Sequence, residues 1–168
     1  MQRSPILKYE SFIPPLKCQS GNILEFVEYK FPSIQESIEK HFDVEIDNIF
    51  DIHIGDIIKK PTCDNSIYNK KWIINRNSDF TGYIPLRTYN NNVPFDIETE
   101  VYGGELFFMN FGYHYYPSMG DLLIYPSSPN FVHFHKEVLV GGFNYIKFYI
   151  RCSESYIHQY TKFNNNLL

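Results

Sequence analysis

The sequence predicts a mainly β domain built as a sandwich or a barrel, because of its composition and because of the way turn residues divide it. The 168 residues include 14 tyrosines and 15 phenylalanines but no alanine, and this bias favours strands over helices. In the second half, short apolar runs alternate with glycine, proline, serine and asparagine, which is typical of successive strands joined by turns. Many short strands spaced in this manner are characteristic of sandwiches and barrels.

Length, charge and cysteine content set the limits of this prediction. We expect one domain over residues 1–168, with a partly ordered tail from residue 153. The net charge is −4 and the basic residues are scattered, which excludes a general nucleic-acid binder. Three cysteines without C-x-x-C spacing argue against a zinc site or a disulfide framework and suit a reducing, cytoplasmic compartment. No apolar run approaches the length of about 18 residues that a membrane span needs.

The N-terminal third is expected to contain two short edge strands followed by a helix. The edge strands are expected within residues 1–31, where apolar residues are separated by one proline pair and by Ser-Gly-Asn. Ser33 and Glu36 form a capping box, and apolar residues then recur at helical spacing, so we expect a helix at 33–42 that packs on the outer face of a sheet. Isoleucines at alternating positions next predict a strand around 52–54.

The rest of the chain is expected to consist of strands and loops. Loops are expected at 61–66 and 90–94, and the aromatic segment 113–116 is expected to be a loop tip that either stacks on a base, a sugar or a protein partner or packs on the barrel rim. Strands are expected at 72–74, 81–89, 102–110, 121–125, 131–140 and 143–151.

Three motifs follow one another in the middle of this region. The first reads Tyr-Gly-Gly-Glu-Leu-Phe-Phe from residue 102, the second Pro-Ser-Met-Gly-Asp-Leu-Leu-Ile-Tyr-Pro-Ser from residue 117, and the third Phe-Val-His-Phe-His from residue 131. Together they resemble the 2-oxoglutarate- and Fe(II)-dependent oxygenases of the prolyl-4-hydroxylase-like type. The run 72–86 is similar to members of that superfamily found in marine bacteriophages. The resemblance covers about residues 72–151.

The resemblance implies a double-stranded β-helix, also called a jelly-roll, with one or two short helices packed on the outside. It also implies Fe(II) held by two histidines and one carboxylate, with 2-oxoglutarate bound beside it. Fe(II) and 2-oxoglutarate are expected if the protein is an active enzyme, and no cofactor is expected if the fold has another function. Gly103 and Gly104 have a second explanation, because close approach of the backbone or a bulge also requires glycine.

The candidate metal ligands that the resemblance implies are His133, His135 and Asp79. The two histidines share one face of a regular strand, and His135 is favoured by its spacing to the following Gly-Gly turn, although either is also compatible with an ordinary core or surface imidazole. Asn77 stands where the first histidine is expected, and an amide is a weak neutral ligand for Fe(II), so the H-x-D motif is degenerate. A literal H-x-D at 41–43 ends the expected helix and is read as a chance match.

The candidate residues for binding 2-oxoglutarate are Lys147, Asn144 and Tyr83. The resemblance implies a cation that pairs with the far carboxylate, and its arginine position falls on Asn144. Lys147 and Arg151 lie on the opposite strand face from Asn144 in a regular strand, and a shift of one residue would bring Lys147 inside the barrel. Without that shift both are solvated charges.

Three functions are therefore open. The first is an oxygenase that hydroxylates an unknown protein or small-molecule substrate. The second is a catalytically degenerate oxygenase fold used for binding or as a structural or assembly component of a virion, with virion proteins as partners. The third is a cupin-like binder of carbohydrate or another ligand. Fold alone does not choose between them. We expect a location in the cytoplasm of the host cell, or in the virion, without contact with a membrane.

Overall fold

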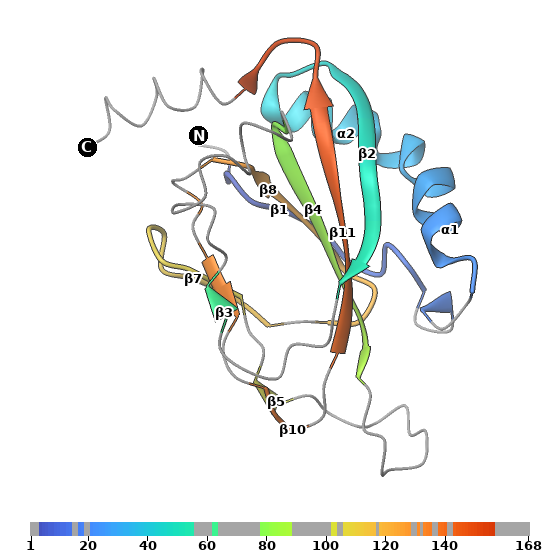
Figure 1. Ribbon diagram of the computed structural model, residues 1–168. Coiled ribbons are helices and arrows are strands. Elements are labelled where there is room, and N and C mark those ends of the chain that lie inside the picture. Colours follow the sequence, from blue (N-terminus) through green and yellow to red (C-terminus); the bar gives the residue numbers. More distant parts are fainter. Residues whose placement is uncertain are drawn as a thin grey trace.

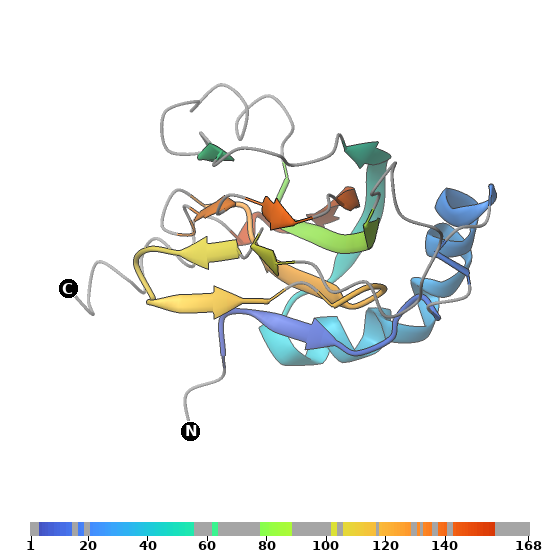
Figure 2. The same cartoon turned by 90° about the horizontal axis from the view of Figure 1, so that it is seen from below.

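The computed structural model places a large twisted sheet between two helices on one side and smaller strands on the other (Figures 1 and 2). The mainly β prediction is confirmed. The structure describes residues 4–14, 17–18, 21–55, 62–63, 78–88, 102–103, 106–116, 118–128, 131, 133–135, 138–140 and 143–156.

The large sheet has five antiparallel strands. Their order across the sheet is β1-β8-β4-β11-β2, so the neighbours are far apart in the chain. The five strands are β1 (Leu7–Tyr9), β2 (Ile46–Gly55), β4 (Phe80–Thr88), β8 (Leu122–Pro126) and β11 (Phe143–Cys152). The longest pairings join β11 to β2 on one side and to β4 on the other, so β4 is the middle strand and β11 lies between it and the edge strand β2.

Two smaller sheets complete the β structure. A four-stranded sheet has the order β3-β9-β6-β7, and a two-stranded sheet joins β10 to β5. Their strands are β3 (Thr62–Cys63), β5 (Tyr102–Gly103), β6 (Leu106–Phe108), β7 (Tyr113–Tyr115), β9 (His133–His135) and β10 (Val138–Val140). Strand β9, which carries both histidines, lies between β3 and β6.

Two helices cover the outer face of the large sheet. Helix α2 (Pro32–Phe42) confirms the expected helix, and its cap differs from the prediction: the N-cap is Phe31, and the hydroxyl of Ser33 donates a hydrogen bond to the carbonyl of Lys30 at 2.6 Å. Helix α1 (Ile23–Lys30) replaces the second of the two expected edge strands, and that prediction was wrong. Neither of these described helices is long and apolar enough to cross a membrane.

The helix α1 was missed because its apolar residues fit two periods. Ile23 and Val27 are four residues apart and both are buried, which places them on one face of a helix. The segment 23–27 also contains adjacent apolar pairs, and a short run of that kind does not separate a strand from a helix. Contact with the sheet decides the outcome, since the buried face of α1 joins the core between helices and sheet.

The large sheet has a different core on each face. Ile146, Phe148 and Ile150 of β11 point toward the helices and belong to the first core cluster. On the other face, which we call the inner face, Tyr83 and Leu123 pack with residues of the smaller sheet such as Phe108. This alternation makes β11 a strand that is buried on both faces, as expected for a strand between two layers.

Other expected elements also changed. The segment 61–66 was expected to be a loop, but Thr62–Cys63 forms β3. The segment 113–116 was expected to be a loop tip, but Tyr113–Tyr115 forms β7, which pairs with β6. The expected strand 102–110 divides into β5 and β6, and 131–140 divides into β9 and β10. The expected strand 72–74, the loop 90–94 and the tail after residue 156 lie outside the described residues.

Candidate functional site

A row of three polar side chains crosses the inner face of the large sheet. Lys147 on β11 is directly opposite Tyr83 on β4 and directly opposite His53 on β2. Directly paired residues of antiparallel strands point to the same face. Tyr83 packs against the smaller sheet, so Lys147 and His53 lie on the same inner face, where the side chain of His53, on the edge strand β2, is 38% exposed. We call these residues the Tyr83–Lys147–His53 row.

The position of Lys147 settles one alternative that the sequence left open. The register between β11 and β4 shifts between Phe143 and Tyr145, and Lys147 lies on the inner face rather than the outer one. Asn144 lies in the shifted part of the strand and is outside the row. The motif-based match to Asn144 therefore does not place that residue beside Tyr83.

Aromatic rings enclose the row on two sides. The ring of Tyr145 lies 5.4 Å from the Nζ of Lys147 and 5.5 Å from the ring of Tyr83. It also covers Gly55, where a Cβ atom would collide with it. On the other side, the ring of Tyr149 stacks on His53 at 6.2 Å. The contact of the Lys147 ammonium with the Tyr145 ring is a cation–π interaction, which favours this position of the lysine.

The surroundings change the acid–base properties of two members of the row. Burial and then the charge of Lys147 lower the pKa of His53 below its ordinary value of 6.5. The Nδ1 of His53 lies 2.8 Å from the carbonyl oxygen of Asp51 and 3.8 Å from its carboxylate. Burial raises the pKa of Tyr83 well above 10, with smaller contributions from Tyr115 and Tyr145. Tyr83 is therefore a protonated phenol at neutral pH, and Tyr83 and Lys147 each present a hydrogen-bond donor to an anion.

The predicted ligand His133 lies in an aromatic environment at the smaller sheet. It is 2% exposed, and its ring contacts those of Phe108 and Tyr125 at 4.9 and 5.0 Å. Its Nδ1 donates to the carbonyl of Phe131 at 3.0 Å, because a carbonyl oxygen only accepts. The Nε2 atom then faces the hydroxyl of Tyr125 at 3.4 Å. Both ring nitrogens thus have a neighbour within the protein.

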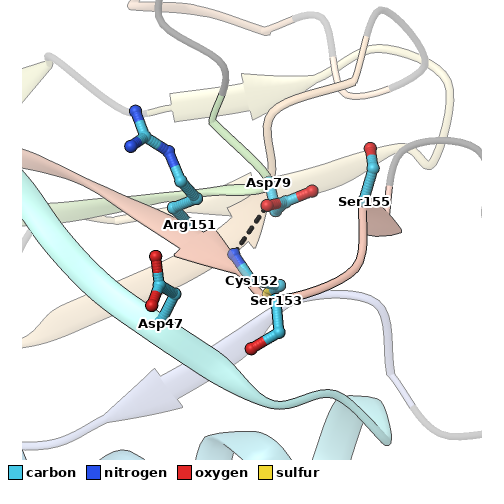
Figure 3. A pocket seen from close by; sticks show the side chains of 6 residues that line it. All are labelled: Asp47, Asp79, Arg151, Cys152, Ser153 and Ser155. Carbon is cyan, nitrogen blue, oxygen red and sulfur yellow. Dashed lines mark hydrogen bonds between the residues drawn. The ribbon is translucent and has the colours of Figure 1, made fainter.

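The predicted ligand Asp79 has a structural role at the end of the large sheet. It is 4% exposed. One carboxylate oxygen accepts a hydrogen bond from the main-chain N–H of Cys152 at 2.7 Å (Figure 3), and the other accepts one from the N–H of Tyr156 at 2.8 Å. The main chain of Asp79 also bonds to Ile150 and Ser127. The carboxylate therefore fixes the end of β11 and the turn that follows it.

These contacts do not fit an iron site built on Asp79 and His133. Both oxygens of Asp79 and both nitrogens of His133 are engaged as described. Among the described residues, no group of three or more His, Cys, Asp or Glu is placed to hold a metal ion. The main chain of His135 pairs with Leu106 and Thr62, while its side chain lies outside the described part of the structure. Metal binding by Asp79, His133 and His135 stays a prediction.

The strand beside the histidines was missed by the sequence reasoning. Thr62 and Cys63 of β3 pair with His135 and Phe134 of β9. One of the two neighbours of the histidine strand β9 is therefore formed by residues 62–63. The H-x-D position was instead expected at residues 75–79, of which residues 75–77 lie outside the described part of the chain. A signal was available, because Asp64 follows Thr62 by two residues and keeps the carboxylate of an H-x-D spacing.

A pocket opens at the end of β11, beyond the row. Its volume is about 520 Å³, and Figure 3 shows its walls, which are Asp47, Asp79, Arg151, Cys152, Ser153 and Ser155. The guanidinium carbon of Arg151 lies 4.7 Å from the ring centre of Phe50. This pocket was not predicted from the sequence, because its walls lie at the ends of β2, β4 and β11, which are distant in sequence and meet only in the folded chain.

Comparison with known proteins supports the fold. No protein-family model and no curated protein sequence matches the chain. Among solved structures, a truncated viral collagen prolyl hydroxylase of Paramecium Bursaria Chlorella virus-1 matches with a TM-score of 0.60 and 12% identity, over 88% of this chain and 90% of that one. The 2OG complex of the same hydroxylase matches with a TM-score of 0.57 and 13% identity, over 90% and 97%. A prolyl-4-hydroxylase of Pseudomonas putida matches with a TM-score of 0.54 and 11% identity, over 88% of each chain.

These likenesses show a shared fold at low sequence identity. The prediction of a double-stranded β-helix with short helices on the outside is confirmed. The similarity spans most of each chain.

Proposed function

We propose that this chain is a 2-oxoglutarate/Fe(II) oxygenase-like protein that binds 2-oxoglutarate on the inner face of its large sheet. The Tyr83–Lys147–His53 row is the observation that carries the proposal. It presents a cation and a protonated phenol from neighbouring strands, within the fold of proteins that include a 2OG complex.

Two members of the row, Lys147 and Tyr83, have a defined part in binding the dicarboxylate. The ammonium of Lys147 pairs with the far carboxylate, because a charge-assisted hydrogen bond is about twice as strong as a neutral one. The phenol of Tyr83, which stays protonated, is the second donor on that side. The ring of Tyr145 contacts the ammonium of Lys147 at 5.4 Å and helps to orient it. Asn144 is not needed for this arrangement.

Hydroxylation of an unknown substrate requires iron, which supplies the oxygen-activating chemistry when it is bound. Asp79 and His133 do not fit as its ligands in this arrangement, because main-chain and tyrosine groups already engage them. We propose His135, together with Asp64, which follows Cys63 in the sequence, as the residues to test instead. No catalytic residue is assigned.

A second function is favoured by those same contacts. In a catalytically degenerate oxygenase fold, Asp79 is kept for stability and His133 for packing, and the barrel serves binding or assembly, for example within a virion. The partners would then be virion proteins in the host-cell cytoplasm or in the particle. The two functions differ in whether iron binds, so one set of measurements separates them.

The first experiment measures 2-oxoglutarate binding by calorimetry with the purified protein under anaerobic conditions. Lys147→Met is expected to weaken binding by at least about tenfold, as the loss of a hydrogen bond to a charged group predicts. Lys40→Met is the matched control, since Lys40 is exposed on α2, on the other side of the sheet. Equal affinity in Lys147→Met and the unsubstituted protein, or no binding, would contradict the proposal.

The second experiment adds Fe(II) to the 2-oxoglutarate complex without oxygen and records the visible absorption. A metal-to-ligand charge-transfer band that disappears in His135→Ala and weakens in Asp64→Asn supports the oxygenase. The absence of the band at saturating iron, with 2-oxoglutarate still bound, supports the degenerate fold. Asp79→Asn is expected to leave the band unchanged.

A further inference from the structure

His53 is the one member of the Tyr83–Lys147–His53 row without a part in the proposed function. We propose that His53, as an imidazolium, is a second cation for the far carboxylate that pairs with Lys147, so that binding of the dianion near neutral pH is accompanied by uptake of a proton. The inference rests on the proposed function, because it concerns the same site. It assigns a further residue that selects an anionic ligand and makes its binding depend on pH.

A bulge in β2 turns His53 toward Lys147. The two residues are directly paired on β2 and β11, which lie side by side (Figure 1). Two positions further along β11, Tyr149 is paired with Phe50, which lies three positions before His53. The extra residue of β2 is accommodated at Asp51, whose φ of 52° is in the left-handed region that aspartate tolerates better than most residues.

This bulge decides which face of the sheet His53 occupies. Phe50 and His53 are three positions apart and would lie on opposite faces of a regular strand. With the bulge, the rings of both residues contact the ring of Tyr149, at 5.8 and 6.2 Å. His53 therefore shares the inner face with Lys147 and Tyr149.

The hydrogen bond at one ring nitrogen of His53 defines what the other nitrogen can do. The Nδ1 atom lies 2.8 Å from the main-chain carbonyl oxygen of Asp51, and a carbonyl oxygen only accepts, so Nδ1 carries the hydrogen. In the neutral ring, Nε2 then has a lone pair and no hydrogen. None of the described residues bonds to that Nε2 atom. Neutral His53 therefore offers an anion only a lone pair, whereas the imidazolium offers a charged N–H donor.

Lys147 and His53 are close enough to act on one carboxylate. Their strands are neighbours, and neighbouring strands lie about 4.8 Å apart. Directly paired side chains also leave the sheet on the same face. The side chain of His53 stays partly exposed, so both a ligand and a proton from the solvent reach it.

The groups around His53 give the sign of the pH dependence. In the described part of the chain, the charged and titratable groups that face it are Asp51 on its own strand and, on β11, Tyr145, Lys147 and Tyr149. Burial and then the charge of Lys147 lower the pKa of His53 in the ligand-free protein. A carboxylate placed beside both cations offsets the charge of the lysine and attracts the proton, so it raises that pKa.

The effect is reciprocal, because proton binding and anion binding are linked. A ligand that raises the pKa of His53 binds more tightly when His53 is protonated. The affinity for the dianion therefore rises as the pH falls through the pKa of His53 in the complex, and it levels off below the pKa of His53 in the free protein. Tyr83 does not contribute to this effect, since its pKa lies well above 10.

The experiment measures 2-oxoglutarate binding to the full chain by calorimetry, without iron, at pH 5.5 and pH 8 and at constant low ionic strength. Carboxyl groups ionise near pH 4, about 1.5 below this range, so the ligand stays a dianion. We expect binding about three- to tenfold tighter at pH 5.5 than at pH 8, as for a partly exposed second cation. Buffers with different enthalpies of ionisation are expected to show uptake of at most about one proton near pH 6.5.

NMR spectra and variants assign the proton to His53. In the unsubstituted protein, the pKa of His53 is expected to rise when 2-oxoglutarate is added. His53→Gln cannot carry a charge, and we expect it to bind 2-oxoglutarate at pH 8 within about twofold of the unsubstituted protein and to lose the pH dependence and the proton uptake. His114→Gln is the matched control, since His114 is exposed on β7, and it is expected to keep both.

The outcomes separate this inference from the proposed function. Equal affinity at pH 5.5 and pH 8, an unchanged pKa of His53 in the complex, or a pH dependence that persists in His53→Gln would each overturn the role of His53 and leave the 2-oxoglutarate site in place. No binding of 2-oxoglutarate at either pH would overturn both. The NMR titration uses the unsubstituted protein, so it decides the question even if His53→Gln does not fold.

Discussion

Replacement of Asp79 tests whether this aspartate stabilises the fold or holds a metal. Its two carboxylate oxygens accept hydrogen bonds from the main-chain N–H groups of Cys152 and Tyr156. Asp79→Asn keeps one acceptor oxygen and turns an NH₂ group toward the other N–H. Asp79→Ala removes both acceptors and leaves two main-chain donors without a side-chain partner.

The magnitude follows from the number and kind of bonds lost. A hydrogen bond to a charged group contributes about 1.5–3 kcal/mol, so we expect Asp79→Asn to lower the free energy of unfolding by about that amount. Asp79→Ala is expected to cost about 3–5 kcal/mol, because the N–H of Cys152 is buried and that of Tyr156 is partly buried. For a chain of this length, 1 kcal/mol corresponds to a change in Tm of about 2–4 °C.

Chemical denaturation of the metal-free protein in the presence of a chelator provides the measurement. Asp47→Asn is the control, because Asp47 is exposed and lines the same pocket. We expect its effect on the free energy of unfolding to be within about 0.5 kcal/mol, as for most surface substitutions. A loss of stability below about 0.5 kcal/mol in Asp79→Asn, combined with a large loss of Fe(II) affinity, would refute the structural role and restore Asp79 as a metal ligand.

Three further predictions concern packing and ionisation. Gly82→Ala is expected to lower the free energy of unfolding by about 1–3 kcal/mol in denaturant titrations, because a Cβ atom there would collide with the ring of Phe148. His53 is expected to titrate below pH 6.5 in NMR spectra, and Lys147→Met is expected to raise its pKa, since the charge of Lys147 opposes protonation. The thiol of Cys152, whose pKa burial and then the charges of Asp79 and Glu39 raise to about 12, is expected to react with a thiol reagent at pH 8 only after unfolding.

The His53 prediction fixes the direction of a pH effect on stability. The pKa of His53 is lower in the folded chain than its ordinary value, so protonation favours the unfolded chain. Its contribution is fully present above pH 6.5 and is lost as the pH falls through the folded-state pKa. His53→Gln should remove this component from the stability measured between pH 8 and pH 5. An unchanged profile would contradict the lowered pKa.

Controls for the other two predictions come from the same chain. Gly21→Ala should leave stability unchanged, because a Cβ atom at Gly21 meets no atom within 4 Å, and a cost equal to that of Gly82→Ala would show that the ring of Phe148 is not the cause. Cys18 is also buried, and burial raises the pKa of its thiol to about 11. Rapid labelling of either buried thiol in the folded protein would contradict the packing around it.

Local signals in the sequence were sufficient for elements whose pattern has one meaning. The helix at 33–42 follows a proline and repeats apolar residues every three to four positions, and the structure has α2 (Pro32–Phe42) there. The strand expected at 143–151 became β11 (Phe143–Cys152). The region 23–30 was ambiguous because both periods fit it. Segment 113–116 was misread because aromatic residues suit a loop tip as well as a strand.

The sequence predicted less of the candidate site than of the fold, because the site depends on strand register and on which distant strands are neighbours. The motifs proposed His133, Asp79 and Lys147 but did not show that main-chain groups engage Asp79 or that Lys147 lies between Tyr83 and His53. A shift of one residue exchanges the two faces of a strand, and residue order alone does not reveal such a shift.

The sequence by itself determined the class of the fold, since apolar period, turn residues and aromatic content act over a few neighbouring positions. The tertiary structure alone decided which side chains share a site. Lys147 and His53 are 94 positions apart, and Asp79 and Cys152 are 73 apart. Such contacts form only when β2, β4 and β11 lie side by side, because their partners are set by the packing of whole strands and not by local propensity.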